Sequence, residues 1–397
     1  MKIVLFVVGF FILIAVEILR VYYIMPFPGS QYDETIDLAY FIHNNIIYFR
    51  LLGIVLVVWP FLYYVRNARW LARTIVWVVF GFYVIVFYLF NFRYLADKMF
   101  LQMKHKTFLS ADRNKKVQPR QLVVGVSLNG ESKAYPIEII GYHHQVRDSV
   151  GGVPVMVTYC TVCRTGRVFS PLLDGKPEKF RLVGMDHFNA MFEDATTKSW
   201  WRQVNGEAIV GPSKGKVLEE LPSMQMSLAA WTYEHPDTRI LQPDTVFTQA
   251  YDGLADYDEG KKTGKLERKD SLSWQRKSWI VGVQIGMESR AYDWIQLQTL
   301  RVINDDLGET PVVLLASPDS VNFYVYDRRV DNDTLFFSIS HDSSGFIDSK
   351  TSSRWNWGGR CEEGLLKGRL LKPIQSYQEY WHSWQTFHPG TTQYEFQ

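Results

Sequence analysis

The sequence predicts an N-terminal α-helical transmembrane anchor followed by a mostly-β (α+β) soluble part built from two duplicated β-rich units. Three observations predict this fold class: long apolar runs near the N-terminus, then short β-rich runs separated by Gly, Pro and Asn, and then a recurrence of the same residues in the same order. We expect a three-span anchor over residues 1–106, a first β-rich unit over 107–245, a charged linker over 246–277 and a second β-rich unit over 278–397.

The three apolar runs cover residues 3–19, 46–65 and 74–92. Each run can cross a hydrocarbon core of about 30 Å once tilt and snorkelling are allowed. The runs are apolar almost all round, which disfavours the core helices of a soluble protein. No A-x-A-like cleavage site follows the first run, so we expect an uncleaved anchor in a lipid bilayer. Arg20 and Arg50 lie near the ends of runs, where their side chains can reach lipid headgroups.

The loops between the runs predict the orientation. The second loop carries Arg66, Arg69 and Arg73, whereas the first loop is acidic and has no Lys or Arg after Arg20. The positive-inside rule then places the second loop in the cytoplasm and the soluble part in the periplasm or outside, for a multi-pass protein of the inner (cytoplasmic) membrane. A group of basic residues after the third run goes against this rule, and we interpret it as a collar that contacts headgroups: Arg93, Lys98, Lys104, Lys106, Lys115 and Lys116. The net charge of +2 predicts no nucleic-acid partner.

The soluble part repeats itself. Residues 125–128 and 133–135 recur as residues 282–285 and 290–292. The same order continues through Asp148 with Asp305, Trp201 with Trp355, and His235 with His388. So many matches in one order predict that the two halves descend from one unit and share one fold.

The main chemical signal is the C-x-x-C motif formed by Cys160 and Cys163. Such a motif can be half of a metal site, a redox pair, a disulfide or two buried thiols. Arg164 follows the second cysteine, and this disfavours attachment of a c-type haem, which needs His there. The flanking residues are typical of two strands, which disfavours a thioredoxin-type motif at the start of a helix.

The second half lacks this site. Ser317 and Ser320 replace the two cysteines, and Leu300 replaces His143, so the fold does not require these residues and their joint absence suggests one shared site. Gly151-Gly152 is a favoured hairpin turn. If the hairpin continues without a bulge, residues whose numbers add to 303 face each other, and His143 faces Cys160.

We therefore predict a metal site at His143, Cys160 and Cys163. Two thiolates and an imidazole suit copper or zinc better than magnesium or calcium, and we prefer copper. The expected partner is a metal ion or a metal-delivery protein. Two alternatives stay open: a thiol-dependent enzyme or redox protein in which His143 acts as base, and a structural or assembly module whose cysteines form a disulfide.

These motifs resemble a bacterial family known as domain-of-unknown-function family 3179. The matching motifs are Ala134-Tyr135-Pro136, the stretch His143 to Asp148, Val150 to Val155, Thr158 to Cys163, Asp194 to Gln203, and Gly206 with Ala208-Ile209 and Gly211. The resemblance covers most of the chain after about Phe108, and the family's His and paired Cys fall on His143, Cys160 and Cys163. This chain departs from the family pattern at His144, Arg147, Thr161-Val162 and Arg164. The resemblance implies no activity.

Overall fold

The structure is a computed structural model that describes residues 1–395. It contains two compact units. Unit 1 comprises residues 1–102 and 178–217, and unit 2 comprises residues 103–177 and the chain from residue 218 onward. Residues 178–217, which we placed in the first β-rich unit, therefore group with the N-terminal helices. The four sequential segments 1–106, 107–245, 246–277 and 278–397 stay a prediction.

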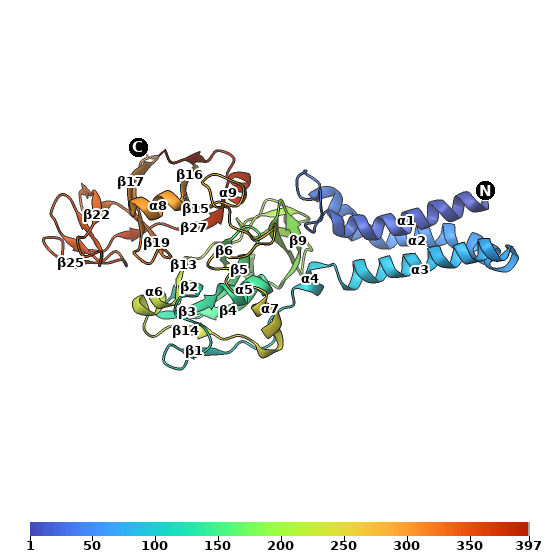
Figure 1. Ribbon diagram of the computed structural model, residues 1–397, viewed down its shortest axis with the longest axis horizontal. Coiled ribbons are helices and arrows are strands. Elements are labelled where there is room, and N and C mark those ends of the chain that lie inside the picture. Colours follow the sequence, from blue (N-terminus) through green and yellow to red (C-terminus); the bar gives the residue numbers. More distant parts are fainter. Residues whose placement is uncertain (396–397) are drawn as a thin grey trace. The chain divides into compact units, whose positions relative to one another are not determined.

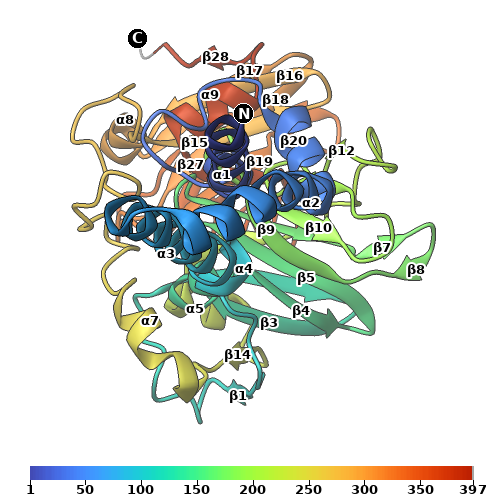
Figure 2. The ribbon, with the colours of Figure 1, turned by 90° about the vertical axis from the view of Figure 1, so that its right-hand side faces the viewer.

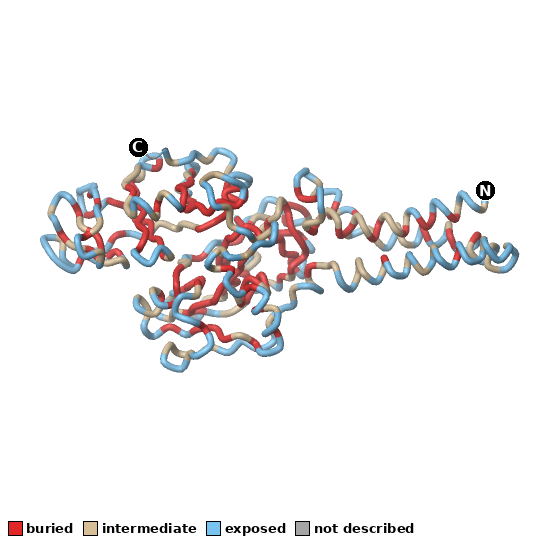
Figure 3. The backbone as a smooth tube through the Cα atoms, in the orientation of Figure 1, coloured by how far each residue is buried: buried red, intermediate tan, exposed pale blue. Residues whose placement is uncertain are grey.

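Three long helices of unit 1 run side by side (Figure 1, Figure 2). They are α1 (Lys2–Tyr22), α2 (Ile36–Asn67) and α3 (Trp70–Phe92). All three are long and apolar enough to cross a membrane, and only a minority of each helix is buried within the protein (Figure 3). A large exposed apolar surface of this kind suits contact with lipid. The predicted three-span anchor is confirmed, although α2 begins ten residues before the predicted run.

A polar cluster joins the three helices. Arg50 Nε donates to Glu17 Oε1 at 2.7 Å, and Asn91 Nδ2 donates to Glu17 Oε2 at 2.8 Å. Arg20 donates to Asn91 Oδ1 at 2.6 Å. We expected Arg20 and Arg50 to reach the headgroups, but both turn inward, because the fully buried Glu17 carboxylate needs positive partners in an apolar surrounding.

A four-stranded antiparallel sheet completes unit 1. Its order is β12-β11-β10-β9, and its strands are β9 (Phe180–Asp186), β10 (Asn189–Asp194), β11 (Trp200–Arg202) and β12 (Ala208–Val210). The short helix α4 (Ala96–Met99) contacts β9. Met185 N donates to Ile24 O at 2.7 Å, and the ring of Trp200 packs edge-on against Tyr40. The sheet thus rests on the connection between α1 and α2, at the other end of α2 from the arginine-rich turn before Trp70.

Unit 2 is mostly β, as predicted. Its first half contains the sheet β1-β14-β3-β2-β13 and the hairpin sheet β4-β5-β6. These strands are β1 (Phe108–Ser110), β2 (Leu122–Leu128), β3 (Glu131–Pro136), β4 (Gln145–Val150), β5 (Val153–Cys160), β6 (Thr165–Phe169), β13 (Met224–Ser227) and β14 (Arg239–Leu241). A small two-stranded ribbon follows β6 and consists of β7 (Leu172–Leu173) and β8 (Lys176–Pro177).

The second half contains the sheets β27-β15-β16-β28, β17-β18-β19-β26 and β22-β23-β24-β25, and the ribbon β20-β21. These strands are β15 (Trp279–Ile285), β16 (Glu288–Asp293), β17 (Val302–Leu307), β18 (Thr310–Ala316), β19 (Phe323–Asp327), β20 (Arg329–Val330), β21 (Asp333–Thr334), β22 (Phe337–Ile339), β23 (Phe346–Asp348), β24 (Arg354–Trp355), β25 (Cys361–Glu363), β26 (Lys372–Pro373), β27 (Ser376–Tyr380) and β28 (Thr392–Gln393).

The order β14-β3-β2-β13 in the first half corresponds to β28-β16-β15-β27 in the second half. Gly125 pairs with Ala134 in one half, and Gly282 pairs with Ala291 in the other. A Cβ atom added at either glycine would meet a tryptophan ring at 2.3 Å, so both glycines are needed for the close approach of that ring. The strand orders match as the repeat predicted, while descent from one ancestral unit stays a prediction.

Short helices pack on these sheets. They are α5 (Ile137–His143), α6 (Leu228–Glu234), α7 (Thr248–Asp252), α8 (Trp294–Leu300) and α9 (Trp381–Phe387), with a 3-10 turn η1 (Thr245–Phe247). Helices α6 and α9 end directly before His235 and His388, and Ser227 caps α6 by accepting from Ala230 N at 3.2 Å. The segment 246–277 is not purely solvated, because Tyr251 and Tyr257 are buried in the core.

Candidate functional site: a buried thiol pair

The C-x-x-C motif forms the turn between two antiparallel strands. Cys160 ends β5 and lies opposite Thr165, the first residue of β6. The intervening residues turn tightly, and Arg164 adopts a left-handed backbone with φ of 56°. The placement of the cysteines between two strands, rather than at a helix start, was predicted correctly.

The two thiols lie together in the interior. Neither cysteine forms a disulfide in the described residues, and neither side chain is exposed (0%). The thiol groups of Cys160 and Cys163 are hydrogen-bonded to each other, and the Ser383 hydroxyl of α9 contacts the Cys163 thiol. Burial, together with the neighbouring Cys160 thiol, raises the pKa of Cys163 well above its ordinary value. Without a ligand that displaces the proton, Cys163 is therefore a neutral thiol at physiological pH.

A lysine supplies positive charge beside the thiols. Lys277 Nζ donates to Val162 O at 2.5 Å, and His382 Nε2 lies 3.3 Å from the same oxygen. Burial lowers the pKa of Lys277 to about 8, and the electrostatic interaction with the two cysteines opposes that decrease. Burial, with Lys277 nearby, lowers the pKa of His382 to about 3. Lys277 is therefore the cation of this site, and His382 is neutral.

The carbonyl groups of the turn are fixed from outside. Tyr257 Oη donates to Thr161 O at 2.8 Å, and Tyr380 N donates to Cys163 O at 3.0 Å. With Lys277 on Val162 O, three successive carbonyls are held by residues beyond position 250. The turn is therefore rigid before any ligand binds.

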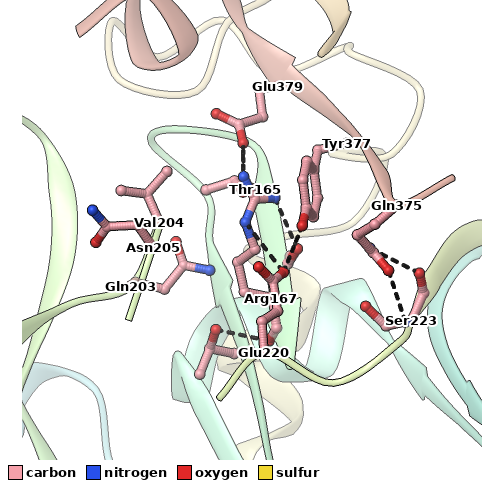
Figure 4. Close-up of polar contacts among 12 residues, drawn as sticks. Thr165, Arg167, Gln203, Val204, Asn205, Glu220, Ser223, Gln375, Tyr377 and Glu379 are labelled. Atoms are coloured by element: carbon pink, nitrogen blue, oxygen red, sulfur yellow. Dashed lines mark hydrogen bonds and ion pairs between the residues drawn. The ribbon is translucent and has the colours of Figure 1, made fainter. Parts of the chain in front are cut away.

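The polar network continues from Ser383 into the space between the two halves. Ser383 Oγ donates to Glu379 Oε2 at 3.1 Å, and Thr165 Oγ1 donates to Glu379 Oε1 at 3.0 Å. Figure 4 shows that Arg167 points toward Glu379 and stacks on Tyr377, with the guanidinium carbon 3.1 Å from the ring centroid. This ion pair is fully buried, so the network fixes α9 and β27 against the thiol hairpin.

His143 does not occupy the predicted position. Residues whose numbers add to 303 do face each other from Gln145 with Thr158 to Val150 with Val153. The ladder ends there, because His143 is the last residue of α5 and His144 caps that helix with a φ of 59°. The expectation that His143 faces Cys160 across two strands is therefore wrong. His143 Nε2 instead lies 2.7 Å from Tyr251 Oη.

Within residues 1–395, no group of three or more His, Cys, Asp or Glu side chains is arranged to hold a metal ion. The metal set of His143, Cys160 and Cys163 stays a prediction.

Residues 102–391 match the protein family described as "Protein of unknown function (DUF3179)". The chain belongs to the DUF3179 family. No curated protein and no solved structure gives a significant match. The DUF3179 region contains both halves of the repeat and the thiol pair, whereas α1, α2 and α3 lie outside it.

Three residues of this DUF3179 site were missed by sequence reasoning: Lys277, Glu379 and Ser383. The repeat offered a signal for two of them. When Trp384 is aligned with Trp231, Glu379 falls on Met226 and Ser383 falls on Ala230. A position that is polar in one half and apolar in the other therefore indicates a residue near the thiols. Lys277 carries no comparable signal.

Proposed function

We propose that this membrane-anchored DUF3179 protein binds one soft transition-metal ion, preferably Cu(I), between Cys160 and Cys163. The observation that carries the proposal is the contact of two fully buried thiols beside the ammonium group of Lys277. Thiolates are the ligands that soft Cu(I) selects, and they bind it by releasing their protons. Two thiolates around Cu(I) carry one net negative charge, which the Lys277 ammonium offsets.

The same geometry weighs against a thiol nucleophile. A reactive cysteine needs a lowered pKa and an approach for its substrate. Here burial raises the pKa of Cys163, and neither thiol is exposed. A thiol pair in this setting is better suited to exchanging protons for a metal ion than to attacking a substrate.

The proposal includes a location. The arginine-rich turn between α2 and α3 favours the cytoplasmic side, and the chain that leaves the other end of α3 then enters the periplasm or the exterior. A tethered Cu(I) site there suits storage of copper, its delivery to a partner protein, or electron transfer.

The test uses the full chain in detergent. The Cys160→Ser/Cys163→Ser double variant is compared with Cys361→Ser, which removes the other buried free cysteine. Cu(I) stoichiometry is measured anaerobically by competition with a coloured chelator. We expect one bound Cu(I) in the parent and in Cys361→Ser, and none in the double variant. Because Ser317 and Ser320 stand at the matching positions of the second half, the serine variant should fold. A reduced parent that binds no Cu(I) would refute the proposal.

His143 is tested separately as a third ligand. The His143→Leu variant copies Leu300 of the second half. Weaker Cu(I) binding, with the thiols intact, would support a place for the imidazole beside the metal. Unchanged Cu(I) affinity would show that His143 is not a ligand and that the two thiols alone bind the metal.

A further inference from the structure

Unit 2 contains a second polar site, a cavity of about 270 Å³ lined by residues of both halves. Its lining includes Arg164 from the thiol turn, Asp258 and Lys269 from the segment between the halves, and Trp279 and Gln378 from β15 and β27. None of these side chains is a ligand in the proposed copper site.

Two cations at this cavity, Arg164 and Lys269, lack a carboxylate counter-ion among the described residues. The buried guanidinium of Arg164 donates to Gln378 Oε1 at 3.0 Å and to Asp258 O at 3.1 Å, and it stacks on Trp279 at 3.6 Å from the ring centroid. Lys269 Nζ lies 4.1 Å from the centroid of the same ring. In the part of the chain that the structure describes, neither Arg164 nor Lys269 forms an ion pair with a carboxylate. Buried positive charge without a partner calls for an anion.

The carboxylates at the cavity do not balance this charge. Glu259 is already paired with Arg120, at 3.1 Å between Oε1 and Nη1. Asp258 supplies one negative charge against the two cations. Burial raises the pKa of Asp258 to about 7, while the Leu122 amide and Arg164 oppose that increase and the carboxylates of Glu138 and Glu259 reinforce it. Asp258 is therefore mostly ionised at about pH 8.

Two lining residues also carry unpaired polar atoms. Gln378 is 2% exposed, and its Nε2 has no hydrogen-bond partner among residues 1–395. Asp258 Oδ1 is buried and equally unpaired, while its Oδ2 accepts from Leu122 N at 2.8 Å. Buried polar atoms are nearly always paired, so an unpaired donor and an unpaired acceptor beside one cavity point to a ligand that offers both.

We propose that this cavity binds an oxyanion that carries its own proton, namely hydrogen phosphate. Arg164, Lys269 and the Gln378 amide attract the negative oxygens. The Asp258 carboxylate repels a fully deprotonated oxyanion but accepts a hydrogen bond from the P–OH group. Sulfate has the same shape and charge but no proton to donate, so Asp258 selects against it. Phosphate diesters of lipid headgroups lack this proton too.

The experiment measures binding of inorganic phosphate to the full chain in detergent at about pH 8, by equilibrium dialysis with labelled phosphate and with sulfate as competitor. We expect saturable phosphate binding that excess sulfate does not displace. Asp258→Asn keeps an acceptor for Leu122 N and turns the free acceptor into a donor. We therefore expect phosphate binding to weaken at least tenfold and sulfate binding to appear.

Two further variants complete the design. Lys269→Met removes one cation from a partly exposed position and should weaken phosphate binding without unfolding the protein. Glu309→Gln removes an exposed carboxylate outside the lining of this cavity and should leave the affinity and the selectivity unchanged. Absence of phosphate binding in the parent, equal competition by sulfate, or an unaltered preference in Asp258→Asn would each overturn the proposal. Because copper binding is measured independently, its failure leaves this result unaffected.

Discussion

Replacing Glu379 by Gln tests whether the buried ion pair joins the two halves. Glu379 is fully buried, and its carboxylate accepts from Arg167, Thr165 and Ser383. Gln keeps the size and removes the charge, which leaves the Arg167 guanidinium in the interior with Glu220 as its remaining carboxylate. Breaking a buried pair by removing one partner costs about 3–5 kcal/mol. We expect a loss of that size in the free energy of unfolding.

Glu220 provides the matched control. It faces the same Arg167 at 3.6 Å, but its side chain is 30% exposed. A partly solvated pair contributes about 0–1 kcal/mol, so Glu220→Gln should have a small effect. Urea unfolding of the full chain in detergent, followed by tryptophan fluorescence, measures both variants. If the two variants lose the same free energy of unfolding to within about 0.5 kcal/mol, the reasoning is wrong, because burial of Glu379 would then add nothing to the stability of its ion pair.

Three further predictions concern packing, charge and topology. Gly282→Ala should destabilise the protein by about 1–3 kcal/mol, because its Cβ would meet the Trp384 ring at 2.3 Å, whereas Gly390→Ala has open space and should be neutral or slightly stabilising in the same unfolding assay. Lys277→Met should weaken Cu(I) affinity at least about tenfold in the chelator competition, since it leaves the copper-thiolate charge unbalanced; equal affinity would exclude Lys277 from the site. A cysteine at Leu365, which is 83% exposed, should react with a membrane-impermeant thiol reagent on intact cells with a permeabilised outer membrane; labelling only after lysis would reverse the orientation.

Local sequence patterns were sufficient for the anchor and for the strands around the thiols. Apolar runs specify spans without reference to the rest of the chain, because most of each helix is not buried within the protein and must be apolar to face lipid. The early start of α2 was missed because residues such as His43 and Asn44 are polar. That first part of α2 contacts the sheet of unit 1, where the rings of Tyr40 and His43 pack against Trp200. A hydropathy pattern cannot distinguish a helix that meets protein from a loop.

The surroundings of the thiols were harder to predict for a different reason. The hairpin register was correct from Gln145 onward, but its extension to His143 failed because the chain changes from strand to helix cap within two residues. Lys277 and Ser383 reach the thiol turn from segments more than 100 residues away. No periodic pattern in either segment predicts these contacts, because they depend on how the two halves pack against each other.

The hydrogen bonds to the carbonyl groups of the thiol turn limit where the chain can be cut without exposing that turn. Lys277, Tyr380 and Ser383 all follow the first half, so a product that stopped before residue 277 would keep both cysteines and expose the backbone that these residues cover. The second half therefore contributes residues to the thiol site in the way that a partner subunit does in a dimer, although both halves belong to one chain. The two cysteines lie in the first half, and much of the protein that covers them comes from the second half.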